Sequence, residues 1–362
     1  MAKRNKYIAL FLLLPISKIY GFVVAVRNKL FDWKFFKQET FDIPLVSVGN
    51  LAVGGTGKTP HVEYIVNAFR ARYNIAVLSR GYKRHTKGFV LATMKSAPTD
   101  IGDEPYQMFH KFGGNVKVAV CEKRKEGIER LREIDPTINL IVLDDAFQHR
   151  YVKPKVSILL TEYNRPIYDD YMLPLGRLRE SASAVSRAEM VIVTKCPAEM
   201  APLKFRLFKK GLNLYPYQQL YFSEYAYEPI QPVFPENVSG MPNLQELTSG
   251  DSLMALCGIA NPRTFNRYVK SYGTKVKSLH FPDHHVYTRE DFDLIEERFA
   301  KLAGRKYIIT SEKDAVRLAS SPYFPHKLKP FIFYVPITVK FKDYETGDFD
   351  NNLEKLIKEV PL

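Results

Sequence analysis

The feature that most constrains the fold is a glycine-rich loop at residues 49–59, which reads Gly-Asn-Leu-Ala-Val-Gly-Gly-Thr-Gly-Lys-Thr. It follows an apolar run at 45–48 that is typical of a buried strand. After the loop, apolar residues recur at the spacing of one helix face: Val62, Ile65, Val66 and Phe69. A strand, a glycine loop and a helix in this order bring backbone N–H groups to a helix N-terminus, where they can bind phosphate. The sequence therefore predicts a phosphate-binding turn.

The residue types of this loop suit a nucleoside triphosphate. Glycines let the backbone curl so that successive N–H groups point at phosphate oxygens. Lys58 can reach the β- and γ-phosphates, and the Thr59 hydroxyl is a natural Mg²⁺ ligand. Position 52 is alanine where the strict pattern has glycine, and the run 54–59 resembles the deviant loops of the dimeric ATPase and GTPase class. The residues expected to bind ATP are Gly54, Gly55, Thr56, Gly57, Lys58, Thr59 and, as a guanidinium fork for phosphate, Arg80.

Two adjacent aspartates complete the expected nucleotide site. Asp144 and Asp145 directly follow the apolar run 140–143, so they emerge where a buried strand ends at the ligand side of a parallel sheet. Two neighbouring carboxylates beside a phosphate need a cation to offset their repulsion. We therefore expect Thr59, Asp144 and Asp145 to bind Mg²⁺, with either aspartate as the direct ligand.

Further apolar runs predict the fold class. They lie at 75–78, 116–120, 156–160 and 190–193. Unbroken apolar strands are buried on both faces, as in a parallel sheet, and their alternation with amphipathic helices is typical of doubly wound α/β proteins. The sequence predicts an α/β protein whose P-loop nucleotide-binding domain spans 41–210.

The rest of the chain is expected to form a connector and a smaller domain. Residues 211–248 are rich in Tyr, Pro, Asn and Gln, which predicts a connector. Strand and helix patterns then resume, and Thr288 with Asp291 forms a capping-box signature. This predicts a second, smaller α/β domain at 249–345, followed by a C-terminal segment at 346–362.

The positive charge is concentrated at the N-terminus. The chain has a net charge of +14, of which the first 37 residues, with eight basic and one acidic side chain, carry half. Their apolar runs, 7–14 and 19–26, are shorter than the roughly 20 residues that span a bilayer. Basic residues beside apolar and aromatic ones predict a membrane-interface helix within 1–40. A signal peptide and an ordinary helix docked on the domain are the alternatives, although no small-x-small cleavage site follows.

Other partners and chemistries are less well supported. No helix-turn-helix, RNP or zinc signature is present, so we expect no nucleic-acid partner. The three cysteines, Cys121, Cys196 and Cys257, have neither disulfide-framework nor zinc spacing, and they fit a reducing compartment. Asp103 lies in the turn Gly-Asp-Glu-Pro, whose local pattern by itself favours a structural turn residue.

Taken together, the motifs resemble those of the tetraacyldisaccharide 4'-kinases, the lipid A kinases of Gram-negative bacteria. Eight blocks occur in the family's order, at 47–60, 79–82, 102–105, 144–150, 173–180, 258–262, 281–285 and 311–315. The family usually has glycine after the aspartate pair, where this chain has Ala146.

The resemblance implies a complete activity. It implies ATP- and Mg²⁺-dependent phosphorylation of the 4'-hydroxyl of an acylated glucosamine disaccharide 1-phosphate, giving lipid IVA. It also implies a peripheral or monotopic enzyme at the cytoplasmic face of the inner membrane, and we expect a monomer. Asp103 would act as the general base on the acceptor hydroxyl, with His284 as its partner in preference to His285, and Lys58 would take part in catalysis. The alternatives are a membrane-recruited P-loop ATPase or GTPase switch without a lipid acceptor, and a nucleotide-dependent adaptor.

Overall fold

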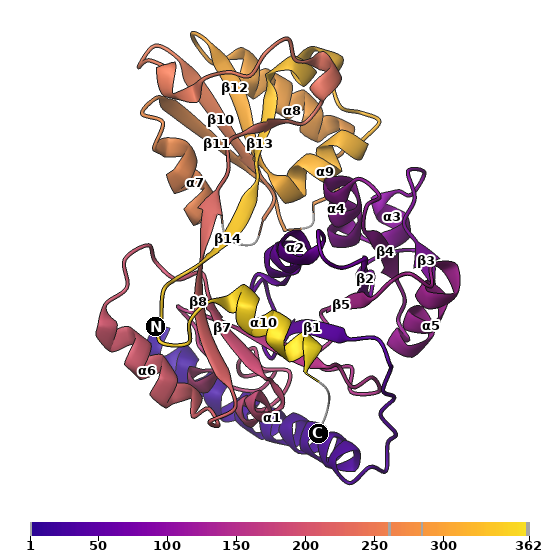
Figure 1. Ribbon diagram of the computed structural model, residues 1–362. Helices are drawn as coiled ribbons and strands as arrows, with labels where there is room; N and C mark the ends of the chain where they lie inside the picture. Colours follow the sequence, from indigo (N-terminus) through magenta and orange to yellow (C-terminus); the bar gives the residue numbers. More distant parts are fainter. Residues whose placement is uncertain (1, 260–261, 284, 360–362) are drawn as a thin grey trace.

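The computed structural model describes residues 2–259, 262–283 and 285–359, with side chains described from residue 12 onward. Two sheets dominate it (Figure 1). The first has nine strands in the order β14-β8-β7-β6-β1-β5-β2-β4-β3. Its strands are β1 (Leu45–Asn50), β2 (Ile75–Ser79), β3 (Val90–Leu91), β4 (Lys117–Val120), β5 (Leu140–Asp144), β6 (Val156–Glu162), β7 (Met190–Thr194), β8 (Gln219–Tyr227) and β14 (Ile337–Phe341).

The first sheet is parallel except at its edges. The seven inner strands pair in parallel, in the order β8, β7, β6, β1, β5, β2 and β4. The two outer strands pair antiparallel, β3 with β4 and β14 with β8. β1, β5, β6 and β7 are almost wholly buried because helices cover both faces. The predicted doubly wound sheet and all six of its predicted strands are confirmed.

Alternate residues of the central strands point to opposite faces. Val46 and Val48 of β1 pack with α2 (Lys58–Phe69), α4 (Asp103–Phe112) and α10 (Phe349–Lys358), while Leu45 packs with α5 (Arg124–Ile134). α6 (Pro202–Leu212) packs on the same side as α5, farther along the sheet. The remaining short elements are α3 (Pro98–Ile101) and 3₁₀ turns at Ile167–Asp169, Ala182–Arg187, Pro235–Asn237, Leu244–Glu246 and His326–Phe331.

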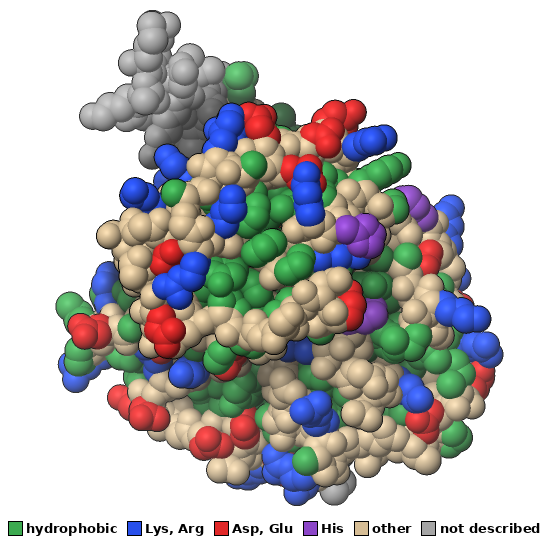
Figure 2. Space-filling model, turned by 90° about the horizontal axis from the view of Figure 1, so that it is seen from above, with side chains coloured by type: hydrophobic (Ala, Val, Ile, Leu, Met, Phe, Trp, Pro, Cys, Tyr) green, Lys and Arg blue, Asp and Glu red, His purple; other side chains and the backbone are tan. Residues whose placement is uncertain are grey.

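The second sheet has five strands in the order β11-β10-β12-β13-β9. They are β9 (Gln231–Pro232), β10 (Ser252–Cys257), β11 (Lys275–His280), β12 (Lys306–Ser311) and β13 (Ile332–Val335), with helices α7 (Arg263–Lys270), α8 (Arg289–Ala300) and α9 (Glu312–Ser320). The predicted capping box is present, because the Thr288 side chain accepts from Asp291 N–H and the Asp291 side chain accepts from Thr288 N–H. Lys and Arg side chains are interspersed with Asp and Glu on this end of the molecule (Figure 2).

The chain passes between the two sheets twice. β8 lies within the segment expected to be a connector, yet it continues the first sheet beside β7. β14 lies within the range expected for the smaller domain, yet it pairs with β8, and α10 then packs on the first core. The second sheet is therefore inserted between two strands of the first, and both sequence-based ranges differ from the structure in this respect.

The N-terminal segment forms one long helix, α1 (Ala2–Asp32), which continues through Pro15. One side docks on the first domain: the Ser17 hydroxyl donates to Met172 O at 2.9 Å, and Asn28 donates to Glu180 at 2.8 Å. Phe31 is only 2% exposed. The other side leaves large apolar side chains in solvent: Leu12, Leu14, Ile16, Ile19, Phe22, Val23 and Val26. Among the described residues, no helix is both long and apolar enough to cross a membrane.

Candidate active site

The glycine-rich loop at 49–59 lies between β1 and α2, as expected. We call it the phosphate loop, after its predicted role. Gly54 and Gly57 have φ values of +114° and +95°, which residues with a Cβ rarely adopt, and Lys58 is the first residue of α2. The Lys58 ammonium lies 3.4 Å from Asn50 Oδ1 and 3.7 Å from Asp145 Oδ2. The loop therefore presents its lysine towards Asp145, which directly follows the neighbouring strand β5.

The pKa values of the two aspartates at the end of β5 shift in opposite directions. Asp144 is buried, and this burial, followed by the charge of Asp145, raises its pKa to about 6. Ser79 donates to Asp144 Oδ2 at 3.3 Å, but within the described chain the buried Oδ1 has no hydrogen-bond partner. Burial would also raise the pKa of Asp145, but Lys58 and Arg179 hold it below its usual range.

This arrangement suits a magnesium ion. The orphaned Asp144 oxygen, the second carboxylate of Asp145 and the hydroxyl of Thr59, at the start of α2, form a set of hard oxygen donors. A buried, unpartnered carboxylate oxygen carries a desolvation cost that a bound cation would offset. The residues predicted for the metal therefore fit Mg²⁺ in their chemistry.

Arg179 also belongs to this site, although no sequence pattern predicts a role for it. Its guanidinium donates to Asp145 Oδ1 and to Asn50 O, both at 3.1 Å. Its backbone N–H donates to Leu51 O at 2.7 Å, so the segment that carries it runs beside the phosphate loop. The motif block 173–180 marked this segment, but only the fold shows that it contacts the loop.

Asp103 is the first residue of α4 and meets the second domain. Arg317, on α9, donates to Asp103 Oδ2 through Nε at 3.0 Å and through Nη2 at 2.7 Å. The next residue, Glu104, pairs with Lys313 at 3.2 Å, and its charge contributes to the raised pKa of Asp144. Asp103 and Glu104 therefore lie between the Asp144–Asp145 pair and α9.

The other predicted residues have different surroundings. His284 lies outside the described residues, and His285 bonds Asp291 Oδ2 at 2.8 Å, which ties it to the start of α8. Arg80 is exposed just beyond the end of β2. Arg124 is buried and donates to the carbonyls of Cys121 and Asp144. All three cysteines are buried and free.

His61, on the first turn of α2, is buried and neutral. Its Nδ1 lies 2.7 Å from Gly57 O and its Nε2 lies 2.9 Å from Ser223 Oγ. Because a carbonyl can only accept, Nδ1 carries the proton and Nε2 accepts from Ser223. Burial lowers the pKa of His61 to about 4, against the opposing effect of the Gly57 bond.

This lowered pKa predicts an acid-sensitive fold. The unfolded chain takes up a proton on His61 below about pH 6.5, whereas the folded chain resists until about pH 4. The contribution to the free energy of unfolding is therefore complete above pH 6.5 and falls by about 3 kcal/mol as pH drops to 4. In urea titrations across this range, His61→Asn should show a shallower pH dependence than the wild type. The same change at exposed His326 serves as control; an unaltered slope in His61→Asn would contradict the prediction.

Comparisons with known proteins find one family and several named relatives that match most of the chain. The family described as tetraacyldisaccharide-1-P 4'-kinase matches residues 9–358. A protein named tetraacyldisaccharide 4'-kinase from Bacteroides thetaiotaomicron is 50% identical over 356 residues, covering 96% of this chain and 93% of its own length. The protein of the same name from Phocaeicola vulgatus is 46% identical, covering 99% and 97%.

A solved structure extends the agreement to the fold. The crystal structure of an "apo" form of LpxK from Aquifex aeolicus in complex with ATP superposes with a TM-score of 0.71 at 27% identity. The match covers 95% of this chain and 96% of the other. The chain therefore belongs to the tetraacyldisaccharide-1-phosphate 4'-kinase family.

Proposed function

We propose that the protein transfers the γ-phosphate of ATP to the 4'-hydroxyl of tetraacyldisaccharide 1-phosphate, which gives lipid IVA in lipid A biosynthesis. The observation that carries the proposal is the group of residues at the carboxyl ends of the central strands, in a chain of this family. There the phosphate loop and the Asp144–Asp145 pair lie together, with Asp103 at the adjoining start of α4. In the proposal, these residues supply a binding site for the phosphates of ATP and a carboxylate for the acceptor hydroxyl.

Phosphoryl transfer depends mainly on positioning and charge neutralisation. In the proposed mechanism, Lys58 and the N–H groups of residues 54–59 bind the phosphates of ATP. Thr59, Asp144 and Asp145 would hold Mg²⁺, which when bound neutralises charge on the phosphate oxygens. Arg80, exposed at the end of the neighbouring strand, is proposed as a further phosphate contact.

Asp103 is proposed as the base that takes the proton of the 4'-hydroxyl as it attacks. The two guanidinium nitrogens of Arg317 converge on Oδ2 and fix the rotation of this carboxylate. His284 is proposed as its partner on the family pattern, and it lies outside the described residues.

The decisive assay uses radiolabelled ATP with and without tetraacyldisaccharide 1-phosphate. We expect label in a lipid product only with the acceptor present. Equal ATP hydrolysis in both reactions, with no labelled lipid, would instead favour the nucleotide-driven switch, which the family membership does not support.

We further propose that α1 rests on the cytoplasmic face of the inner membrane of a Gram-negative bacterium, and that the protein is a monomer there. The support is the apolar side of α1, together with exposed Trp33 and Phe35 and the basic residues of the same segment. Apolar residues beside basic ones favour an anionic lipid surface.

Replacing three side chains of α1 tests this location. Ile19, Phe22 and Val23 are 66%, 69% and 60% exposed, so serines there should leave the fold intact. We expect binding to anionic vesicles in a pelleting assay to fall at least about tenfold, because three apolar side chains no longer insert. A control triple at exposed Met94, Met241 and Tyr323 should bind like the wild type. Unchanged pelleting of the α1 triple would exclude α1 as the lipid contact.

A further inference from the structure

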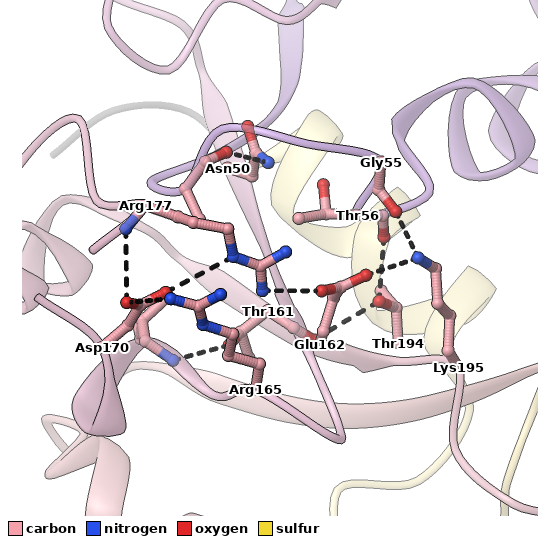
Figure 3. Close-up of polar contacts among 12 residues, drawn as sticks. Asn50, Gly55, Thr56, Thr161, Glu162, Arg165, Asp170, Arg177, Thr194 and Lys195 are labelled. Atoms are coloured by element: carbon pink, nitrogen blue, oxygen red, sulfur yellow. Dashed lines mark hydrogen bonds and ion pairs between the residues drawn. The ribbon is translucent and has the colours of Figure 1, made fainter. Parts of the chain in front are cut away.

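Three consecutive carbonyls of the phosphate loop are each held by a side chain from outside the loop. Lys195 donates to Gly55 O, and the Thr194 hydroxyl donates to Thr56 O at 2.8 Å (Figure 3). His61 Nδ1–H donates to Gly57 O at 2.7 Å. Two of these donors lie at the end of β7 and the third lies on α2. Side chains from two separate elements therefore bind the backbone of residues 55–57.

A hydrogen bond that fixes the direction of a backbone carbonyl also fixes the direction of the N–H in the same peptide group. In a trans peptide the C=O and the following N–H point in opposite directions. The carbonyls of Thr56 and Gly57 face their side-chain donors, so the N–H groups of Gly57 and Lys58 point to the other side of the loop. Within the described chain these two N–H groups have no acceptor, and they lie at the N-terminus of α2, where an anion binds favourably.

We propose that Thr194, Lys195 and His61 are positioning residues for ATP, which preset the loop so that its N–H groups already face the phosphates. A loop that is ordered before binding loses less conformational entropy when the ligand arrives, so its affinity is higher. The inference rests on the ATP-binding part of the proposed function and goes beyond it, because none of the three side chains belongs to the glycine-lysine-threonine motif.

A second layer keeps Lys195 in place. Glu162, at the end of β6, accepts from Lys195 and also from Arg177 at 3.1 Å (Figure 3). Burial would raise the pKa of Glu162, but Lys195 and Arg177 hold it below its usual value, so the carboxylate is charged. Asp170 in turn fixes Arg177, accepting its backbone N–H at 3.3 Å. Arg177 O accepts from Val53 N–H at 2.8 Å, which returns the network to the phosphate loop.

The support continues below Gly57. His61 is held by Ser223 of β8, as described above, and the neighbouring Tyr225 lies directly under the loop. A Cβ on Gly57 would overlap the Tyr225 hydroxyl, and its φ of +95° also favours glycine. Residues of β8 and at the end of β7 therefore pack against the phosphate loop and support its backbone.

The test measures binding of Mg·ATP in the absence of any lipid acceptor, by isothermal titration calorimetry. Thr194→Val keeps the shape but removes the donor, and Lys195→Met removes the charge but keeps the length. Each should raise the Kd about tenfold, the effect of one lost hydrogen bond of typical strength. Thr194→Ser, which restores a hydroxyl, should recover most of the affinity, and the KM for the lipid acceptor should stay unchanged.

Matched controls separate positioning from general stability. Thr310, on β12, is buried with no hydrogen-bond partner for its hydroxyl in the described structure, so Thr310→Val should bind Mg·ATP normally. Exposed Lys209, paired with Glu345, gives Lys209→Met as the second control. Wild-type affinity in folded Thr194→Val and Lys195→Met would overturn the proposal, as would an equal loss in the controls. If the wild type binds Mg·ATP but labels no lipid, the proposed function fails while this inference stands.

Discussion

Asp103→Asn is expected to lower kcat at least about 100-fold, with the Kd for Mg·ATP nearly unchanged. The amide has the shape of the carboxylate but cannot take the proton of the acceptor hydroxyl. In the proposed mechanism ATP binds at the phosphate loop, on another element, so its affinity should not depend on this group. Single-turnover transfer of label to tetraacyldisaccharide 1-phosphate gives the rate, and calorimetry gives the Kd.

The control for Asp103→Asn is a second aspartate that pairs with an arginine. Asp42 accepts from Arg132 Nη2 at 3.1 Å on the surface, and Asp42→Asn should retain full turnover. Because Asp103 also binds Arg317 across the two domains, the melting temperatures of both variants must be compared. Turnover within about fivefold of wild type in folded Asp103→Asn would remove this residue from the proposed mechanism.

Lys58→Met is expected to reduce kcat/KM for ATP about 100- to 1000-fold. Removing one preorganised donor from a site where negative charge develops typically has an effect of this order. The loss should appear in kcat as well as in nucleotide affinity, because the ammonium would contact the phosphoryl group that is transferred. Initial rates over a range of ATP concentrations separate the two parameters.

Lys209→Met controls for the loss of one positive charge. Lys209 and Glu345 are both more than 60% exposed, so their pairing should contribute little. Full activity in Lys209→Met with a large loss in Lys58→Met would locate the effect at the loop. A loss below about tenfold in Lys58→Met would show that backbone N–H groups and Mg²⁺ suffice to bind the triphosphate.

The central strands were predictable because each carries its own signal. β1, β5, β6 and β7 are buried on both faces, and their sequences are mainly apolar. β8 lies in a tyrosine-rich segment whose residue types show no regular period, so its local sequence predicts a connector. β14 is a partly exposed edge strand whose partner lies more than 100 residues away, so local sequence could not assign it to the first sheet.

The same distinction applies to the site. The phosphate loop and the Asp144–Asp145 pair are contiguous in sequence, and their spacing alone indicates their chemistry. Arg317 contacts Asp103 across 214 residues, and Lys195 contacts Gly55 across 140. Neither basic residue has a distinctive local pattern, so only the folded chain shows what it contacts.

The double passage of the chain between the sheets has a consequence for biosynthesis. During translation β8 emerges more than 100 residues before β14, so the first sheet lacks this edge strand and its covering helix α10 until residues 337–358 have left the ribosome. By then the whole of the second sheet has been available to fold. The nascent first sheet therefore has β8 as an open edge, a surface that is prone to mispairing until β14 has been synthesised.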